Sequence, residues 1–259
     1  MQRRDFLTGF GAGVSLVGGA YVGWRQFFDR SPPRSYYHIS YAQAGEDLAV
    51  WSIFEFLKTS LKTYLDVGAY EPILSNNTYF FYEQGARGVL VEPNIDMIPE
   101  LKKVRPGDTV LNVGIGATDQ KEADYFRMSL PQRNTFSREE AERIEAATGK
   151  KEFIREVVKI PLVNINAMIA EHFKAAPLHL VSIDTEGFDL PILKSFDFKK
   201  HRPWVFCVET VLLAEVTKQE AAIFELMAEH DYLPRGGSLV NTVFVDRKVL
   251  AQFSKDPGS

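Results

Sequence analysis

The stretch that most constrains the fold is residues 64–92, which begin with a short apolar β-type run that contains Asp66. A turn through Gly68 and Ala69 follows, then a helical run closed by glycine, and then a second β-type run that ends on Glu92. Strand, glycine turn, helix, strand and acid is the order of a nucleoside-binding βαβ unit.

The same stretch indicates which nucleoside ligand would fit. A small residue after the first strand lets the backbone approach a ligand, and a carboxylate at the tip of the second strand can hold two ribose hydroxyls. The G-x-G-x-x-G pattern that cradles a diphosphate is not present here. This favours a nucleoside ligand without a diphosphate, and S-adenosylmethionine is the common one.

Composition narrows the class of protein. With 259 residues, of which 45% are hydrophobic, the chain can bury a full core and is not disordered. The formal net charge of −4 argues against a dedicated nucleic-acid binder. The single cysteine, Cys207, excludes an intramolecular disulfide and a cysteine-based zinc site, and its apolar neighbours predict a buried core thiol.

Residues 1–34 read as a separate N-terminal segment with a linker. Arg3 and Arg4 resemble a twin-arginine export signature, and the uncharged residues 6–24 that follow are compatible with membrane association. Three interpretations stay open: a cleaved export signal, an uncleaved anchor, or an over-extended start. We expect an anchor with the catalytic domain in the cytoplasm, because a methyl donor made and kept there would not serve an exported enzyme.

Residues 35–259 are expected to form one α/β domain. Strand and helix patterns alternate, which predicts a Rossmann-like, doubly wound and mostly parallel sheet covered on both faces. Strands are expected at 109–113, 123–128, 157–163, 178–183 and 203–209, with a capped helix opening at Ser137 and stopping near Gly149. Gly236 and Gly237 separate two last β-type runs, which predicts a closing antiparallel hairpin.

Four acids end or nearly end the expected strands: Asp66, Glu92, Asp184 and Glu209. Ligands of such sheets bind outside the carboxyl ends of the strands, so these side chains should gather along one rim. Any one of them alone is as easily a helix cap or a solvated loop residue. Together, clustered carboxylates raise one another's pKa and make a base or a cation site.

Five motifs in order make this sequence resemble the FkbM-type methyltransferase family over residues 40–246. Residues 64–77 look like its donor-binding motif, and 89–94 match its strand-acid-Pro-Asn signature. Residues 112–117 stand at its third-strand turn, and 183–187 match its Asp-x-Glu-Gly motif. Residues 42–47 are similar to its Ser-Gln-x-Gly-Glu-Asp lead-in, with Ala42 in place of serine. The chain departs from the family at Glu71 and Pro72, where many members have glycine.

The resemblance implies a seven-stranded methyltransferase sheet and methyl transfer from S-adenosylmethionine to an oxygen, commonly on a sugar or a glycosylated natural product. It places Glu92 on the donor's ribose. The other residues that it assigns to the donor pocket are Asp66, Gly68, Ala69, Tyr70, Asn77, Asn112, Gly114 and Gly116. The implied partner is a small-molecule or glycan acceptor rather than a nucleic acid.

A methyl acceptor hydroxyl benefits from a nearby base, for which Asp184 is our first candidate and Glu209 our second. Glu186 is interpreted either as part of this site or as a cap of the following helix. No histidines stand at metal-ligand spacing, so the sequence predicts no metal site. A Mg²⁺ ion held by Asp184 and a neighbour is compatible with the sequence but is not indicated by it.

Two alternatives to a methyltransferase remain at this stage. A nicotinamide-dependent oxidoreductase shares the βαβ order, but it would need the missing diphosphate glycines and a proton-donor arrangement. A non-catalytic, membrane-tethered nucleoside- or carbohydrate-binding module is the alternative from another class. Residues 134–137 interrupt the core pattern and are either an acceptor-side lid or a surface excursion. The sequence does not set the acceptor or the oligomeric state.

Overall fold

The computed structural model describes residues 38–149, 153–174, 176–210 and 218–253. The chain divides into two units, Met1–Ile39 and Ser40–Ser259, and the fold below is that of the second unit. The predicted signal or anchor within residues 1–34 lies outside the described residues. In the ranges that are described, no helix has both the length and the apolar character needed to cross a bilayer.

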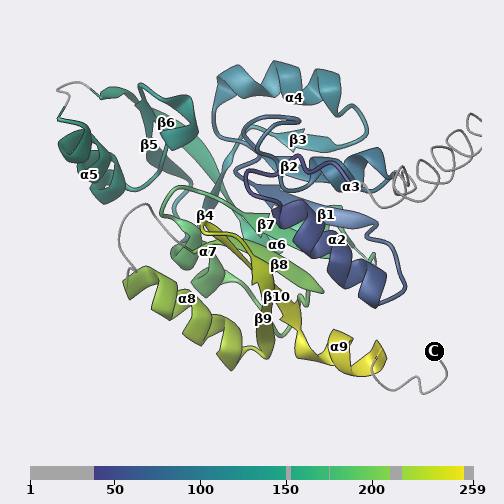
Figure 1. Ribbon diagram of the computed structural model, residues 1–259. Helices are drawn as coiled ribbons and strands as arrows, with labels where there is room; N and C mark the ends of the chain where they lie inside the picture. Colours follow the sequence, from purple (N-terminus) through teal and green to yellow (C-terminus); the bar gives the residue numbers. More distant parts are fainter. Residues whose placement is uncertain (1–37, 150–152, 175, 211–217, 254–259) are drawn as a thin grey trace, which may run out of the picture. The chain divides into compact units, whose positions relative to one another are not determined.

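Seven strands form one sheet in the order β3-β2-β1-β7-β8-β10-β9 (Figure 1). Their bounds along the sheet are β3 (Thr109–Leu111), β2 (Arg87–Val91), β1 (Thr63–Val67), β7 (Leu180–Ile183), β8 (Val205–Glu209), β10 (Asn241–Asp246) and β9 (Tyr232–Gly237). The strands from β3 to β8 are parallel, and β10 is antiparallel to β8 and to β9. The mostly parallel seven-stranded sheet with a closing hairpin is therefore confirmed, but Gly236 and Gly237 belong to β9 and do not separate the two strands.

The central strands are continuous apolar runs because helices cover both of their faces. Every residue of β7 and of β8 is buried, as expected for parallel strands between two helical layers. Alternate side chains of β1 therefore enter different cores, with Leu65 and Val67 in one and Tyr64 in the other. Cys207 of β8 is fully buried, which confirms the predicted core thiol.

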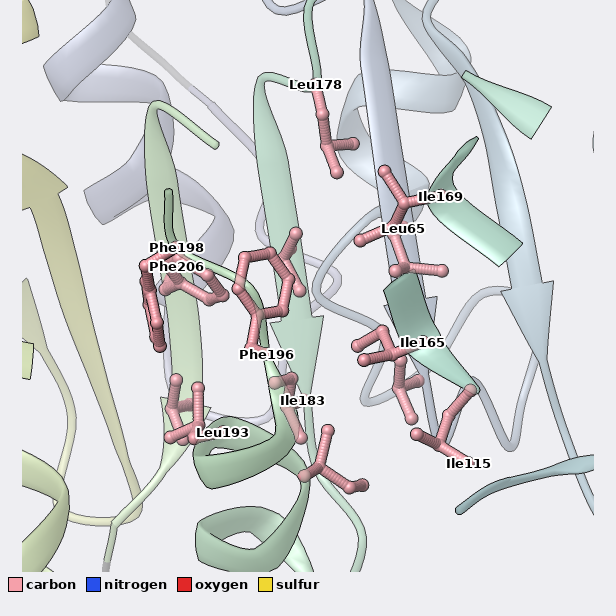
Figure 2. Packing of buried hydrophobic residues seen from close by; sticks show 14 of the residues in the cluster. Leu65, Ile115, Ile165, Ile169, Leu178, Ile183, Leu193, Phe196, Phe198 and Phe206 are labelled. Atoms are coloured by element: carbon pink, nitrogen blue, oxygen red, sulfur yellow. The ribbon is translucent and has the colours of Figure 1, made fainter. Parts of the chain in front are cut away.

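Two groups of helices cover the sheet. Buried side chains of α2, α3 and α4 pack on the Tyr64 face, and those of α6, α7 and α8 pack on the Leu65 face. Figure 2 shows the core on the Leu65 face, where Leu65 and Ile183 of the sheet lie against α6 and α7 residues such as Ile169 and Leu193. The helix bounds are α2 (Glu46–Phe56), α3 (Tyr79–Glu83), η2 (Ile95–Met97), α4 (Ile98–Val104), η3 (Pro131–Arg133), α5 (Arg138–Thr148), α6 (Ile165–His172), α7 (Asp189–Ser195), α8 (Lys218–Glu229) and α9 (Arg247–Phe253).

A second, three-stranded sheet has the order β4-β6-β5 and carries α5 (Figure 1). Its strands are β4 (Gly114–Gly116), β5 (Glu122–Met128) and β6 (Ile154–Asn164). The strand predicted over residues 109–113 ends at Leu111. The next residue, Asn112, donates side-chain hydrogen bonds to the backbone carbonyls of Glu92 and Pro93, both at 2.9 Å. The chain then leaves the main sheet and starts β4.

The helix predicted between Ser137 and Gly149 is confirmed in its cap chemistry. The Ser137 hydroxyl accepts a hydrogen bond from the Glu140 backbone N–H at 3.1 Å, as an N-cap should. Gly149 closes the helix in the left-handed region, with φ of 61°. This places α5 directly after residues 134–137, of which Asn134 and Phe136 line the site described next.

Candidate active site

A cavity of about 520 Å³ opens at the carboxyl ends of β1, β2, β7 and β8. Its volume lies within the ~300–1,000 Å³ that is usual for small-molecule sites. Gly68, Glu92 and Gly114 form one part of its wall, and Asp184 and Glu209 form another part. The cavity therefore sits where parallel α/β sheets bind their ligands.

Gly68 lets the chain turn sharply at the cavity wall. Its φ is 86°, and a Cβ atom at this position would overlap the carbonyl oxygen of Asp184. The Gly68 N–H donates to the Val91 carbonyl at 2.9 Å, and the Asp184 N–H donates to the Val67 carbonyl at 3.0 Å. Three strand ends are thus held together at a point where only glycine fits.

Glu92 is held rigidly on the same wall. One carboxylate oxygen accepts from the Tyr70 N–H at 2.8 Å, and the other accepts from the Asn94 N–H at 2.6 Å. The side chain is buried, and burial raises the pKa of Glu92 to about 7. Each oxygen keeps further acceptor capacity, so the carboxylate is pre-oriented to accept two hydroxyl donors.

Replacing Glu92 by Ala should weaken binding of S-adenosylhomocysteine, the spent donor, by ~1.5–3 kcal/mol, because hydrogen bonds to a charged group are lost. Isothermal titration calorimetry measures this directly. The wild-type affinity should also rise as the pH increases through about 7, since the ribose hydroxyls donate to the ionised form of Glu92. Glu92→Gln is the matched variant and should bind with a flat pH profile. Unchanged affinity in Glu92→Ala would exclude the ribose assignment.

Three carboxylates meet at the ends of β7 and β8. One oxygen each of Asp184, Glu186 and Glu209 lies within 4.8 Å of the others. Arg133 donates to Glu186 at 2.7 Å, whereas Glu209 Oε2 is buried and has no hydrogen-bond partner. Burial raises the pKa of all three carboxyl groups, and repulsion among the acids raises the pKa of Asp184 and Glu209 further, whereas Arg133 opposes the rise at Glu186.

The loop after β7 brings Glu186 into this cluster. Its backbone is left-handed at Glu186, with φ of 50°, and at Gly187, with φ of 97°. The buried Asp189 carboxylate fixes the loop by accepting hydrogen bonds from the backbone N–H groups of Thr185 and Gly187 and from the Thr185 hydroxyl. Asp189, not Glu186, therefore organises the start of α7, and the helix-cap interpretation of Glu186 is wrong.

The sequence-predicted site residues divide into two groups. Those that line the cavity are Gly68, Tyr70, Glu92, Gly114, Asp184 and Glu209. Those outside its lining are Asp66, Ala69, Asn77, Asn112 and Gly116. Asp66 departs most from the expectation of four acids on one rim, because its carboxylate accepts from the Thr78 hydroxyl at 2.7 Å inside the fold. The Asn77 amide donates to the Ser182 hydroxyl at 3.2 Å.

Several residues of the cavity wall were not singled out from the sequence. Arg133 is one, because its partner Glu186 is far away along the chain. Tyr125 of β5 is another, and burial raises the pKa of its hydroxyl. Residues 134–137, by contrast, were singled out, and Asn134 and Phe136 among them line the cavity, which agrees with the lid alternative rather than with a surface excursion.

The comparisons with known proteins bear on this geometry. The model of the Methyltransferase FkbM domain matches residues 66–234, which include Gly68, Glu92, Gly114, Asp184 and Glu209 of the cavity lining. The chain belongs to the FkbM methyltransferase family. Family membership makes it a methyltransferase that uses S-adenosylmethionine, and it favours this function over the nicotinamide-dependent and non-catalytic alternatives. No curated protein matches this FkbM-family chain.

Solved structures with a similar arrangement include several methyltransferases. The TehB-like SAM-dependent methyltransferase from Corynebacterium glutamicum is 9% identical, with 90% of this chain and 99% of that chain covered and a TM-score of 0.41. The O-methyltransferase from Bacillus cereus in complex with SAH is 11% identical, with 81% and 83% covered and a TM-score of 0.41. The 1,6-didemethyltoxoflavin-N1-methyltransferase from Burkholderia thailandensis is 11% identical, with 94% and 89% covered and a TM-score of 0.38.

Proposed function

We propose that this FkbM-family enzyme transfers the methyl group of S-adenosylmethionine to a hydroxyl oxygen on a sugar or a glycosylated natural product. The observation that carries the proposal is that two unlike sets of residues line one cavity. Gly68 and Glu92 offer close backbone approach and a ribose acceptor, and Asp184 and Glu209 offer proton acceptors in the same cavity.

Methyl transfer from S-adenosylmethionine needs few groups besides a donor pocket and a base. The sulfonium of the donor is already activated, so the enzyme has to align the methyl group with the attacking oxygen and exclude water. A neutral hydroxyl is a weak nucleophile, and loss of its proton to a carboxylate as the C–O bond forms makes the attack favourable. Asp184 is proposed as this base, with Glu209 next to it.

The polar residues of the cavity wall also suit a polar methyl acceptor. Gln43, Gln132 and Asn134 line it together with the carboxylates, and amide groups both donate to and accept from hydroxyls. The net charge of −4 makes a polyanionic nucleic acid an unfavourable acceptor. A hydroxyl-rich, uncharged acceptor suits this wall.

The chemical stability of the methylated product tests the proposal. The enzyme is incubated with methyl-labelled S-adenosylmethionine and a panel of simple glycosides, with matched amines and carboxylic acids for comparison. We expect label in a product that resists alkaline hydrolysis, since an ether does and a methyl ester does not. Label that enters only amines, or that is released as methanol by base, would overturn the assignment to a hydroxyl oxygen.

A further inference from the structure

We propose that Asp184, Glu186 and Glu209 form a binding site for one hard divalent cation of the Mg²⁺ and Mn²⁺ class. The three carboxylates come from two structural segments, the loop after β7 and the end of β8. Only the ion's role in catalysis rests on the proposed function. Its binding is a separate property of the cluster.

The spacing of the oxygens fits a shared ion. One oxygen from each residue lies within 4.8 Å of the other two, and this is the one group of this kind among the described residues. Ligands around an octahedral Mg²⁺ ion stand at about 2.1 Å from it, so that opposite ligands are roughly 4.2 Å apart. The three oxygens therefore need only small side-chain rotations to reach one centre.

An independent observation at Glu209 points to a ligand. Glu209 is 4% exposed, it lines the cavity, and its Oε2 atom has no hydrogen-bond donor. A buried carboxylate oxygen without a partner is costly, and such groups call for an explanation such as an ion. A cation between Glu209 and Asp184 satisfies this oxygen.

The local charge balance leads to the same conclusion. Arg133 pairs with Glu186 at 2.7 Å, while Asp189, the next carboxylate along the chain, is occupied by Thr185 and Gly187. Three carboxylates against one guanidinium leave two negative charges if all are ionised. A divalent cation neutralises these charges, and an all-oxygen donor set selects Mg²⁺, Mn²⁺ or Ca²⁺ over softer metals.

The ion would act on the acceptor. Mg²⁺ keeps several coordination positions for water or substrate, and an acceptor hydroxyl bound there has a lowered pKa. In the transfer step the C–S bond of the sulfonium breaks and the O–CH₃ bond forms. The hydroxyl proton passes to a cluster carboxylate or to water, and neutral S-adenosylhomocysteine leaves.

Mn²⁺ is the probe for the test, because its free form has a strong electron paramagnetic resonance signal that disappears on binding. The full chain, without donor or acceptor, should bind one Mn²⁺, and Mg²⁺ should displace it. Glu209→Gln and Glu186→Gln should each weaken binding by at least about 10-fold, since even changes outside the first coordination shell cost that much. Glu71→Gln, which lines the same cavity outside the cluster, is the matched control and should bind as wild type.

Thermal melting shows whether the variants are folded. Without metal, Glu209→Gln should melt no lower than wild type, because the change removes a buried, unpartnered charge. Added Mg²⁺ should raise the melting temperature of wild type and not that of Glu209→Gln.

The proposal is overturned if wild type binds no Mn²⁺ at about 1 mM, the weak end of protein cation sites. It is also overturned if Glu209→Gln binds like wild type, or if Glu71→Gln loses as much affinity. Failure of the function proposal is distinct: the chain would bind Mn²⁺ and S-adenosylhomocysteine, yet methylate no hydroxyl.

Discussion

Replacing Asp184 by Asn should lower kcat by about 10²–10⁴-fold, the usual contribution of a positioned general base. Asn has the same shape and cannot accept the proton of the hydroxyl. The backbone N–H of Asp184, which bonds to the Val67 carbonyl at 3.0 Å, is unaffected by the change. Affinity for S-adenosylhomocysteine should therefore stay at the wild-type value in calorimetry while methyl transfer is nearly lost.

A surface carboxylate provides the control. Asp124 of β5 pairs with Lys159 at 2.8 Å away from the cavity lining, so Asp124→Asn should keep wild-type turnover. Donor affinity that falls in step with turnover in Asp184→Asn would show a donor-site or structural role instead. A wild-type rate that persists in a strong chelator would show that Asp184 works as a base without a cation.

The fold was predictable in its order of elements but not in its second sheet. Continuous apolar runs such as residues 178–183 predicted buried parallel strands, and β7 confirms them. Strands were also predicted at 123–128 and 157–163, where β5 and β6 lie. A strand pattern does not identify the strand's partner, because the pattern depends on which face is buried and not on the neighbour. The separate β4-β6-β5 sheet was therefore not foreseen.

The candidate site was predictable where strand topology places a residue. Glu92, Asp184 and Glu209 follow parallel strands whose carboxyl ends must meet, and all three line the cavity. Asp66 stands one residue before the end of β1, so its side chain is on the opposite face from Leu65 and Val67. Successive side chains of a strand point to opposite faces of the sheet. The motif alone did not show to which face the Asp66 side chain would point.

Buried polar contacts between distant segments were the least predictable part. Arg133 meets Glu186 only because η3 and the loop after β7 face the same cavity. Arg105 was missed as well, because it follows two lysines, and such a charged run is typical of a solvent-exposed segment. The two lysines are indeed exposed. The Arg105 side chain is fully buried in the structure, and it is the basis of the second large effect that we expect.

Arg105 holds the loop after β1 to the end of α4. Its guanidinium donates to Asp108 at 2.8 Å, to Asn76 at 3.0 Å and to Thr78 at 2.9 Å. It also donates to the Tyr64 hydroxyl at 2.8 Å. Asn76 in turn donates to the carbonyls of Ala69 and Glu71, at 3.1 and 2.9 Å. The arginine thus supports the loop that carries Gly68 and Tyr70 at the cavity wall.

Replacing Arg105 by Met should reduce the free energy of unfolding by ~3–5 kcal/mol, because the change leaves buried Asp108 without its cation. Methionine keeps the length and the apolar stem of the side chain, so the loss reports the missing charge rather than a cavity. Urea denaturation at neutral pH measures the change. Lys103→Met, two residues earlier in the last turn of α4, is the matched control. Lys103 is 76% exposed at its side chain, and an exposed change of this kind costs within about 0.5 kcal/mol.

A double-mutant cycle separates the charge pair from the rest of the network. Asp108→Asn removes the opposite charge while keeping groups that bond the Gly88 N–H and the Tyr64 hydroxyl. If the buried pair carries the effect, the double variant should be more stable than the sum of the two single losses predicts, by ~0.5–3 kcal/mol. Strictly additive losses would show that Arg105 acts through Asn76 and Thr78 instead. Because that loop borders the cavity, Arg105→Met should then weaken S-adenosylhomocysteine binding more than Asp108→Asn does.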